Sequence, residues 1–319
     1  AKAQQLLKDL PKRNIVSWNA LIAGYGQQGQ YKEALNCFKQ MQSEGFVPNN
    51  VTFAFTLQAC TIIGAIAQGE EIHRVIKIKE FLKGDIFLGN ALLSMYAKCC
   101  FLTAAHEVFE ALPIRDVVTW TTLIGGYANH DFGVEALNYY GNMQGEGVTP
   151  NAHTYVCSLK ACGILKDAKK GKEIHSDIIK KDLLKNEVVG SALIDMYGKC
   201  GLLAKAHEVF EKLSVQDIIS WTVLIAGYIE QGQSRKALSL YETIKLNGIS
   251  PDEVTYCCAL KACGNLGIIE KGEEIHADIV RTGLFKDNRH IGNALIDMYA
   301  KCGELVKAQK VFDQLTTPD

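Results

Sequence analysis

Residues 293–303 read Asn-Ala-Leu-Ile-Asp-Met-Tyr-Ala-Lys-Cys-Gly, and close variants of this stretch occur at 90–100 and 191–201. Tryptophan repeats with the same rhythm, because it occurs only at Trp18, Trp120 and Trp221. A period of about 100 residues predicts an array of similar structural units and argues against one globular domain built around one pocket.

Each period divides into three helical hairpins. In the first hairpin, Trp18, Leu21, Ile22 and Tyr25 follow the i, i+3, i+4, i+7 spacing of one helix face. Gly45 stands where the second helix of that hairpin requires a C-terminal cap. No segment shows the alternation of a β-strand, so we predict an all-α chain.

The hairpins have three lengths that alternate in a fixed order. We predict a right-handed α-solenoid superhelix of helix–turn–helix repeats. The predicted units are a partial repeat at 1–14 and complete repeats at 15–49, 50–85, 86–116, 117–151, 152–186, 187–217, 218–252, 253–288 and 289–319.

Charge and hydropathy exclude some functional classes. The chain of 319 residues has 34 basic and 35 acidic residues, which gives a net charge of −1. A protein that binds nucleic acid mainly through counterion release would be strongly basic, so specific contacts and local clusters of charge would have to contribute here. No apolar run approaches the length of about 18 residues that a membrane helix needs, so we expect no membrane partner.

Cysteine and histidine also follow the repeats, but their spacing does not suit a metal. The eleven cysteines include no Cys-x-x-Cys pair, and most recur at fixed places such as Cys60 and Cys99. We expect small, largely buried thiols in a reducing compartment. One Cys and one His per unit cannot supply the four ligands of a zinc site, so we expect neither a metal nor a cofactor. His73, His175 and His276 are predicted to be packing or capping groups.

The repeated strings are similar to those of pentatricopeptide repeats, specifically the plant subclass in which P, L and S motifs alternate. The resemblance rests on Val-Ser-Trp-Asn-Ala-Leu-Ile-Ala-Gly-Tyr at 16–25, on Gly-Lys-Glu-Ile-His at 171–175 and on the stretch at 293–303. A tetratricopeptide array, the nearest alternative, would have a uniform period of about 34 residues and would lack the Ala-Lys-Cys-Gly signature.

The resemblance implies sequence-specific binding of single-stranded RNA, one nucleotide per repeat, with the N-terminus towards the RNA 5′ end. It also implies that the fifth and last residues of each repeat choose the base. The chemistry is reasonable, because a carboxylate accepts from the ring N–H of guanine or uracil and an amide donates to the bare ring nitrogen of adenine or cytosine. A small hydroxyl at the fifth position leaves room for a purine, whereas Asn reaches a pyrimidine.

Six repeats carry a polar pair at these positions. The pairs with the bases that they imply are Asn19 with Asn49 (cytosine or uracil), Asn90 with Asp116 (uracil), Thr121 with Asn151 (adenine), Ser191 with Asp217 (guanine), Thr222 with Asp252 (guanine) and Asn293 with Asp319 (uracil). The L-type repeats have Ala54, Val156 and Cys257 at the fifth position and are expected to be weakly selective. The implied target is 5′-YNUANGGNU-3′.

The same register gives two supporting sets. Second residues would stack on base faces, namely Val16, Phe87, Val118, Val188, Ile219 and His290. Three lysines at a position that approaches phosphates in this family are Lys98, Lys199 and Lys301.

Larger members of the subclass often end in a cytidine-deaminase domain, which needs His-x-Glu and Cys-x-x-Cys to hold zinc. Neither pattern occurs here, so we expect no enzymatic activity from this chain. The leading hypothesis is transcript recognition for C-to-U editing in a chloroplast or mitochondrion, with editing factors or a C-terminal deaminase domain outside this chain as partners. The alternatives are an organelle RNA stabilisation or processing factor and a peptide-binding scaffold. The chain opens within a repeat, so a transit peptide would lie outside it.

Overall fold

The computed structural model describes residues 14–78, 84–213, 215–285 and 288–316, and every regular element in these ranges is a helix. The prediction of an all-α fold is therefore confirmed. The first helices of the hairpins are α2 (Ile15–Gln27), α4 (Asn50–Ile63), α6 (Ile86–Lys98), α8 (Val117–Asn129), α10 (Ala152–Leu165), α12 (Glu187–Lys199), α14 (Ile218–Glu230), α16 (Glu253–Leu266) and α18 (Arg289–Lys301).

A second helix follows each first helix after a short turn. The second helices are α3 (Tyr31–Ser43), α5 (Ile66–Ile78), α7 (Leu102–Ala111), α9 (Gly133–Gly145), α11 (Ala168–Lys180), α13 (Leu203–Lys212), α15 (Ser234–Leu246), α17 (Ile269–Thr282) and α19 (Leu305–Thr316). A 3-10 turn, η2 (Leu183–Lys185), follows α11.

Each first helix begins at the residue at which the sequence analysis begins a complete repeat. The local cause is an Asn or Asp directly before it, which accepts hydrogen bonds from backbone N–H groups of the first turn. Asn49 accepts from Thr52 N, Asp116 from Thr119 N and Asp252 from Thr255 N. A side-chain acceptor at this position satisfies donors that the helix itself leaves unpaired. The last residue of one repeat is thus the N-cap of the next.

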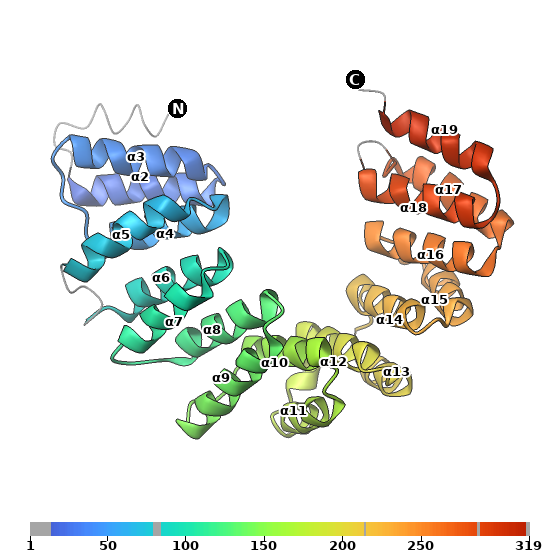
Figure 1. The fold of residues 1–319 in the computed structure, drawn as a ribbon, viewed down its shortest axis with the longest axis horizontal. Helices are drawn as coiled ribbons and strands as arrows, with labels where there is room; N and C mark the ends of the chain where they lie inside the picture. The colour runs from blue at the N-terminus through green and yellow to red at the C-terminus, as the bar shows by residue number, and fades with distance from the viewer. Residues whose placement is uncertain (1–13, 79–83, 214, 286–287, 317–319) are drawn as a thin grey trace. The chain divides into compact units, whose positions relative to one another are not determined.

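The chain forms two compact units, residues 1–161 and 162–319. In the first unit α2 packs on α4, α4 on α6 and α6 on α8, while each first helix also packs on the second helix of its own hairpin (Figure 1). In the second unit the corresponding series is α12, α14, α16 and α18. Within each unit the first helices therefore form one continuous layer, as in an α-solenoid.

The repeated aromatic residues form the junctions between hairpins. Trp120 of α8 is buried, and its ring meets the Phe109 ring of α7 edge-on at 4.8 Å between centroids. Trp221 of α14 meets Phe210 of α13 in the same way at 4.6 Å. These edge-on contacts favour the opposite charges of ring face and ring edge. The tryptophans belong to the core that the sequence pattern predicts.

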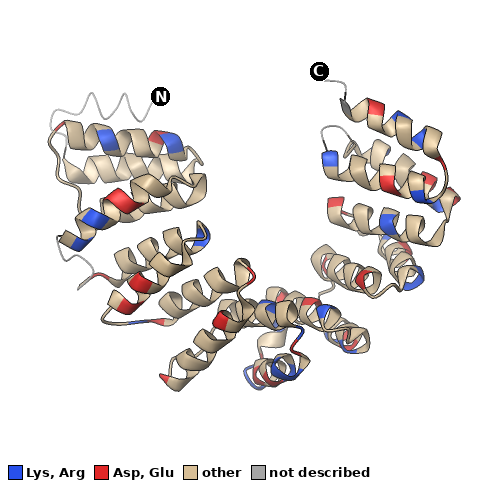
Figure 2. Ribbon diagram, in the orientation of Figure 1, with Lys and Arg blue, Asp and Glu red and all other residues tan. Residues whose placement is uncertain are grey.

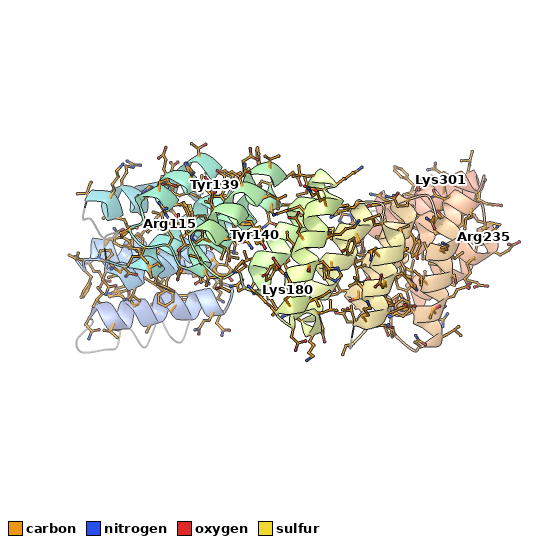
Figure 3. All side chains as sticks on the ribbon, turned by 90° about the horizontal axis from the view of Figure 1, so that it is seen from below. Arg115, Tyr139, Tyr140, Lys180, Arg235 and Lys301 are labelled. Carbon is orange, nitrogen blue, oxygen red and sulfur yellow. The ribbon has the colours of Figure 1, made fainter. Side chains whose placement is uncertain are left out.

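Arg115, labelled in Figure 3, closes one such junction. Its guanidinium lies 4.5 Å from the centre of the Phe109 ring, and its Nε donates to the Phe109 carbonyl oxygen at 3.1 Å. One side chain thus ties the end of α7 to the start of α8. Among the described helices, none combines the length and the apolar character that crossing a lipid bilayer would require.

Candidate nucleic-acid interface

The predicted base-reading pairs lie where the layer of first helices meets the N-caps. In two repeats the fifth and last residues contact each other directly. Asn19 Nδ2 lies 3.1 Å from Asn49 Oδ1, and Asn90 Nδ2 lies 3.3 Å from Asp116 Oδ1. The structure therefore brings together these residues, which are 30 and 26 positions apart in sequence.

In the repeats with a hydroxyl at the fifth position, another residue lies between the pair. Thr121 Oγ1 is 2.7 Å from Thr154 Oγ1, which in turn is 3.0 Å from Asn151 Oδ1. Thr222 Oγ1 is 2.5 Å from Thr255 Oγ1, which donates to the Asp252 carboxylate.

The Ser191 repeat has the same arrangement. Its Oγ lies 3.0 Å from Ser220 Oγ, and the Ser220 backbone N–H donates to Asp217 Oδ1 at 2.8 Å. The fifth residue thus reaches the last residue of its repeat through the third residue of the following repeat.

These third-position hydroxyls are not among the site residues predicted from the sequence. All five have fully buried side chains: Thr52, Thr119, Thr154, Ser220 and Thr255. A signal for them exists in the sequence. A hydroxyl stands at the third position where the preceding repeat has a polar fifth residue, whereas Leu88, Val189 and Ile291 stand there where the preceding fifth residue is Ala54, Val156 or Cys257.

The fifth residues form the floor of this face and are not fully open to solvent. Asn19, Ser191 and Thr222 have exposed fractions of 9%, 9% and 6%, while Asn90 and Thr121 are half-buried. Asn293 is exposed, and its partner Asp319 lies outside the described residues. A ligand could therefore touch only the outer atoms of these side chains.

Asp116 remains an anion in this setting. Burial raises the pKa of its carboxyl group, but hydrogen bonds from the Thr119 backbone N–H and from Asn90, with the Thr119 hydroxyl close to the same oxygen, outweigh burial, and the resulting pKa lies below the ordinary value. A carboxylate fixed by donors on one oxygen keeps the other oxygen as an acceptor.

The predicted stacking residues are exposed. The apolar ones, Val16, Phe87, Val118, Val188 and Ile219, have exposed fractions from 50% to 69%, and His290 is exposed as well. Apolar side chains of this size would normally be buried, and a regular row of them at one helix position is a surface suited to flat apolar partners. Val51, His153 and Val254 extend the row through the repeats at 50–85, 152–186 and 253–288.

The three predicted phosphate lysines differ in their surroundings. Lys199 Nζ lies 2.7 Å from Asp195, and Lys301 Nζ lies 2.7 Å from Asp297. Lys98 has Ser94 one turn before it, and no carboxylate of the described residues forms an ion pair with it. Figure 2 shows basic and acidic residues mixed along the helices of both units. Of the three lysines, Lys98 therefore has the charge that is least neutralised by neighbouring carboxylates.

A hollow of about 460 Å³ in the first unit collects members of all three predicted sets. Its lining includes Lys98, Val118, Thr121, Asn151 and His153, which come from three consecutive hairpins. Two second-position residues, the predicted base-reading pair and a predicted phosphate lysine thus surround one space.

The cysteines and histidines form no competing site in the described residues. No group of three or more His, Cys, Asp or Glu residues in this part of the chain is arranged to hold a metal ion. All eleven cysteines are free thiols, and burial raises the pKa of Cys60 to about 11 and of Cys162 to about 12. Such thiols are protonated and unreactive at neutral pH.

Two family models match the chain. One, described as the PPR repeat family, matches residues 13–61, 115–163 and 216–265, and the other, described as the PPR repeat, matches residues 191–218 and 293–317. Both describe repeats and not an enzymatic domain, which agrees with the expectation that the chain is not an enzyme.

Named relatives come from Arabidopsis thaliana. "Pentatricopeptide repeat-containing protein At4g18520, chloroplastic" is 35% identical over 96% of this chain, and "Pentatricopeptide repeat-containing protein At3g09040, mitochondrial" is 34% identical over 98%. The chain spans 49% of the first relative and 30% of the second.

The fold also matches a solved structure. The crystal structure of maize PPR10 in complex with an 18-nt psaJ RNA element aligns with a TM-score of 0.77 at 18% identity, over 98% of this chain and 47% of PPR10. The matched repeats, the relatives and the hairpin architecture lead to one assignment. This chain belongs to the pentatricopeptide repeat family.

Proposed function

We propose that this chain binds single-stranded RNA in a sequence-specific way, one nucleotide per repeat, with its N-terminus towards the RNA 5′ end. The fifth and last residues read the base, and the proposed target is 5′-YNUANGGNU-3′. Three features support the proposal: the hydrogen-bonded polar pairs, the exposed row of second-position side chains, and the fold shared with an RNA-bound protein of this family.

The hollow around Thr121 and Asn151 is the observation that carries the proposal. Its volume of about 460 Å³ is in the range of sites for small ligands. The fourth base would enter between the second-position residues Val118 and His153, with its pairing edge towards Thr121 and Asn151. Base stacking on such groups contributes roughly 1–3 kcal/mol per base.

Phosphate attraction has a minor part in this binding mode. With a net charge of −1, the chain cannot rely on bulk counterion release. Lys98 is free to approach the phosphate beside the fourth base, because it lines the same hollow and has no ion-pair partner among the described residues. Sequence selectivity would then arise from bases, and salt dependence from a few lysines.

We place the chain in the P-L-S subclass and assign it to organelle transcripts. The alternating unit lengths support the subclass, and the chloroplastic and mitochondrial relatives support the location. The leading role is recognition of a transcript for C-to-U editing, with deaminase chemistry supplied outside this chain. The alternative is stabilisation or processing of an organelle RNA without editing.

The experiment is a competition binding assay with nine-nucleotide RNAs that differ only at the fourth position. The wild-type protein should prefer adenine there. The double variant Thr121→Asn with Asn151→Asp recreates the Asn90–Asp116 pair and should prefer uracil.

Two results would contradict the proposal. An unchanged preference in the double variant would refute the register of the pairs. Binding that ignores base sequence altogether would refute RNA reading and favour a peptide-binding scaffold.

A further inference from the structure

The backbone fixes the orientation of the cap amides Asn49 and Asn151. The backbone N–H of Thr52 donates to Asn49 Oδ1 at 3.0 Å, and that of Thr154 donates to Asn151 Oδ1 at 2.9 Å. A backbone N–H can only donate, so each contacted atom must be the amide oxygen. The NH₂ group of each cap amide therefore lies on the other side, where it is available to a ligand.

The third-position hydroxyl then fixes an Asn at the fifth position. Asn19 Nδ2 faces the fixed oxygen of Asn49, so its Oδ1 must face Thr52, whose hydroxyl donates to it at 2.6 Å. Thr119 does the same for Asn90, with Oγ1 at 2.7 Å from Asn90 Oδ1. Each of these hydroxyls also lies 2.9 Å from the cap oxygen, of Asn49 or of Asp116, but a backbone N–H already donates to that oxygen, so we assign the one hydroxyl proton to the Asn. The oxygen of the fifth amide is thus occupied inside the protein, and one N–H of its NH₂ group remains for a base.

A hydroxyl at the fifth position presents an acceptor to the ligand, whereas Asn presents a donor. Thr154 has one proton, which it donates to Asn151 Oδ1 at 3.0 Å, and its oxygen accepts from the Asn151 backbone N–H at 3.2 Å. Both contacts are satisfied when Thr154 donates to Asn151 and accepts from Thr121, so we assign the proton on the 2.7 Å contact to Thr121. Thr121 has then used its proton and presents only lone pairs outwards.

The Thr222 network agrees. Thr255 lies 2.6 Å from Asp252 Oδ1 and 2.5 Å from Thr222 Oγ1, and both contacts are satisfied when Thr255 donates to Asp252 and accepts from Thr222. Ser191 differs, because its proton goes to the Glu187 carbonyl oxygen at 3.0 Å in its own helix.

We propose that the buried hydroxyl at the third position of the following repeat determines which hydrogen-bonding group the fifth residue offers to RNA. It makes Asn a donor and makes Thr an acceptor. The inference rests on the proposed function and names Thr52, Thr119, Thr154 and Thr255 as positioning residues that do not touch the base.

The resulting polarities match the pairing edges of the four bases. Acceptor plus amide donor fits adenine, with Thr121 accepting from the N6 amine and Asn151 donating to N1. Acceptor plus carboxylate fits guanine, whose N1–H and N2 amine both donate. Donor plus carboxylate, as in Asn90 with Asp116, fits uracil. Donor plus amide donor, as in Asn19 with Asn49, fits the N3 and O2 acceptors of cytosine, so the first position of the target becomes cytosine.

The test isolates the fifth-residue contact with a base analogue at the fourth nucleotide. Unsubstituted purine keeps N1 for Asn151 but lacks the N6 amine, so it removes only the contact to Thr121. We expect the wild-type protein to bind the adenine RNA roughly tenfold more tightly than the purine RNA, the ratio for one hydrogen bond. Thr154→Val should lower the ratio, because the freed Thr121 hydroxyl can rotate and no longer holds its lone pairs towards the N6 amine.

Two controls separate positioning from folding. Thr154→Ser restores a hydroxyl and should restore the tenfold ratio. Ser158→Ala removes another fully buried hydroxyl of α10, which donates to the Thr154 carbonyl oxygen at 2.8 Å and lies outside the network, and should leave the ratio unchanged. Base preference at the third nucleotide, read by Asn90 and Asp116, should be the same in all variants.

The outcomes are distinguishable. If the wild-type protein shows no base preference at the fourth nucleotide, the proposed function and this inference both fail. If it prefers adenine but Thr154→Val keeps the adenine-to-purine ratio, only the inference is overturned. Equal binding of cytosine and uracil at the first nucleotide would likewise overturn the donor–donor assignment while leaving pyrimidine recognition intact.

Discussion

Nδ1 of His175 lies 2.8 Å from the hydroxyl oxygen of Tyr197, so a hydrogen bond joins the second helix α11 to the first helix α12 of the next hairpin. His73 and Tyr96 repeat this contact at 2.9 Å, and His276 and Tyr299 repeat it at 2.8 Å. The three histidines are packing groups, as the sequence pattern predicts. Each joins the second helix of one hairpin to the first helix of the next.

These histidines should make the protein less stable in mild acid. Burial lowers the pKa of His175, and Lys205 and Lys212 lower it further against the opposing effect of Glu208. Burial likewise lowers the pKa of His73 and of His276. The unfolded chain has an ordinary pKa of about 6.5 and therefore binds more protons between that pH and the folded-state pKa. The contribution of these histidines to the free energy of unfolding should be complete above a pH of about 6.5 and should decrease as the pH falls below that value.

The measurement is urea unfolding as a function of pH. His175→Gln removes one titrating group and should flatten the dependence below neutral pH. His153→Gln, at an exposed position of α10, is the matched control and should leave the slope as it is. A slope that is unchanged in His175→Gln would show that this junction does not contribute.

Cys100→Gly should stabilise the first unit. Cys100 has a left-handed backbone with φ of 66°, while its counterparts in the repeats at 187–217 and 289–319 are Gly201 at 74° and Gly303 at 82°. A residue with a Cβ atom pays about 1–2 kcal/mol for this conformation, and the exposed Cys100 side chain loses little burial when removed. We expect a gain of about 1 kcal/mol in the free energy of unfolding. Gly201→Cys should produce the opposite change, and a loss of stability in Cys100→Gly would refute the argument.

Gly126→Ala should loosen the contact between α6 and α8. A Cβ atom on Gly126 would lie 2.8 Å from the Cβ atom of Ala97, which is buried and has no flexible end that could move away. Overpacking of this kind costs about 1–3 kcal/mol. Gly141→Ala is the control, because a Cβ atom there meets nothing within 4 Å and removes the helix penalty of glycine. The control should gain stability in thermal unfolding where the test variant loses it.

Lys98→Ala should weaken RNA binding equally for all base sequences. A phosphate contact carries no base identity, and each one contributes about one unit to the dependence of log K on log salt concentration. Lys199→Ala should have a smaller effect, because Asp195 already compensates the Lys199 charge. Binding titrations at several salt concentrations measure both slopes. A base-selective loss in Lys98→Ala would contradict a phosphate role.

Much of this protein could be predicted from short stretches of its sequence. The helix starts, the Asn and Asp caps and the buried tryptophans follow from 3.6-residue periodicity and from capping groups that act within one turn. The left-handed turn at Cys100 could be anticipated too, because glycine stands at the equivalent places of sibling repeats. All of these features depend on neighbours close in the chain.

The polar network depends on tertiary packing. Thr121 and Thr154 are 33 positions apart, and their oxygens meet at 2.7 Å only because two first helices lie side by side. The sequence identified the pairs at the fifth and last positions, but it did not show that a buried hydroxyl stands between them. Three residues from two neighbouring repeats together decide which oxygen receives each proton. Helix packing holds the atoms of these residues in fixed positions relative to one another.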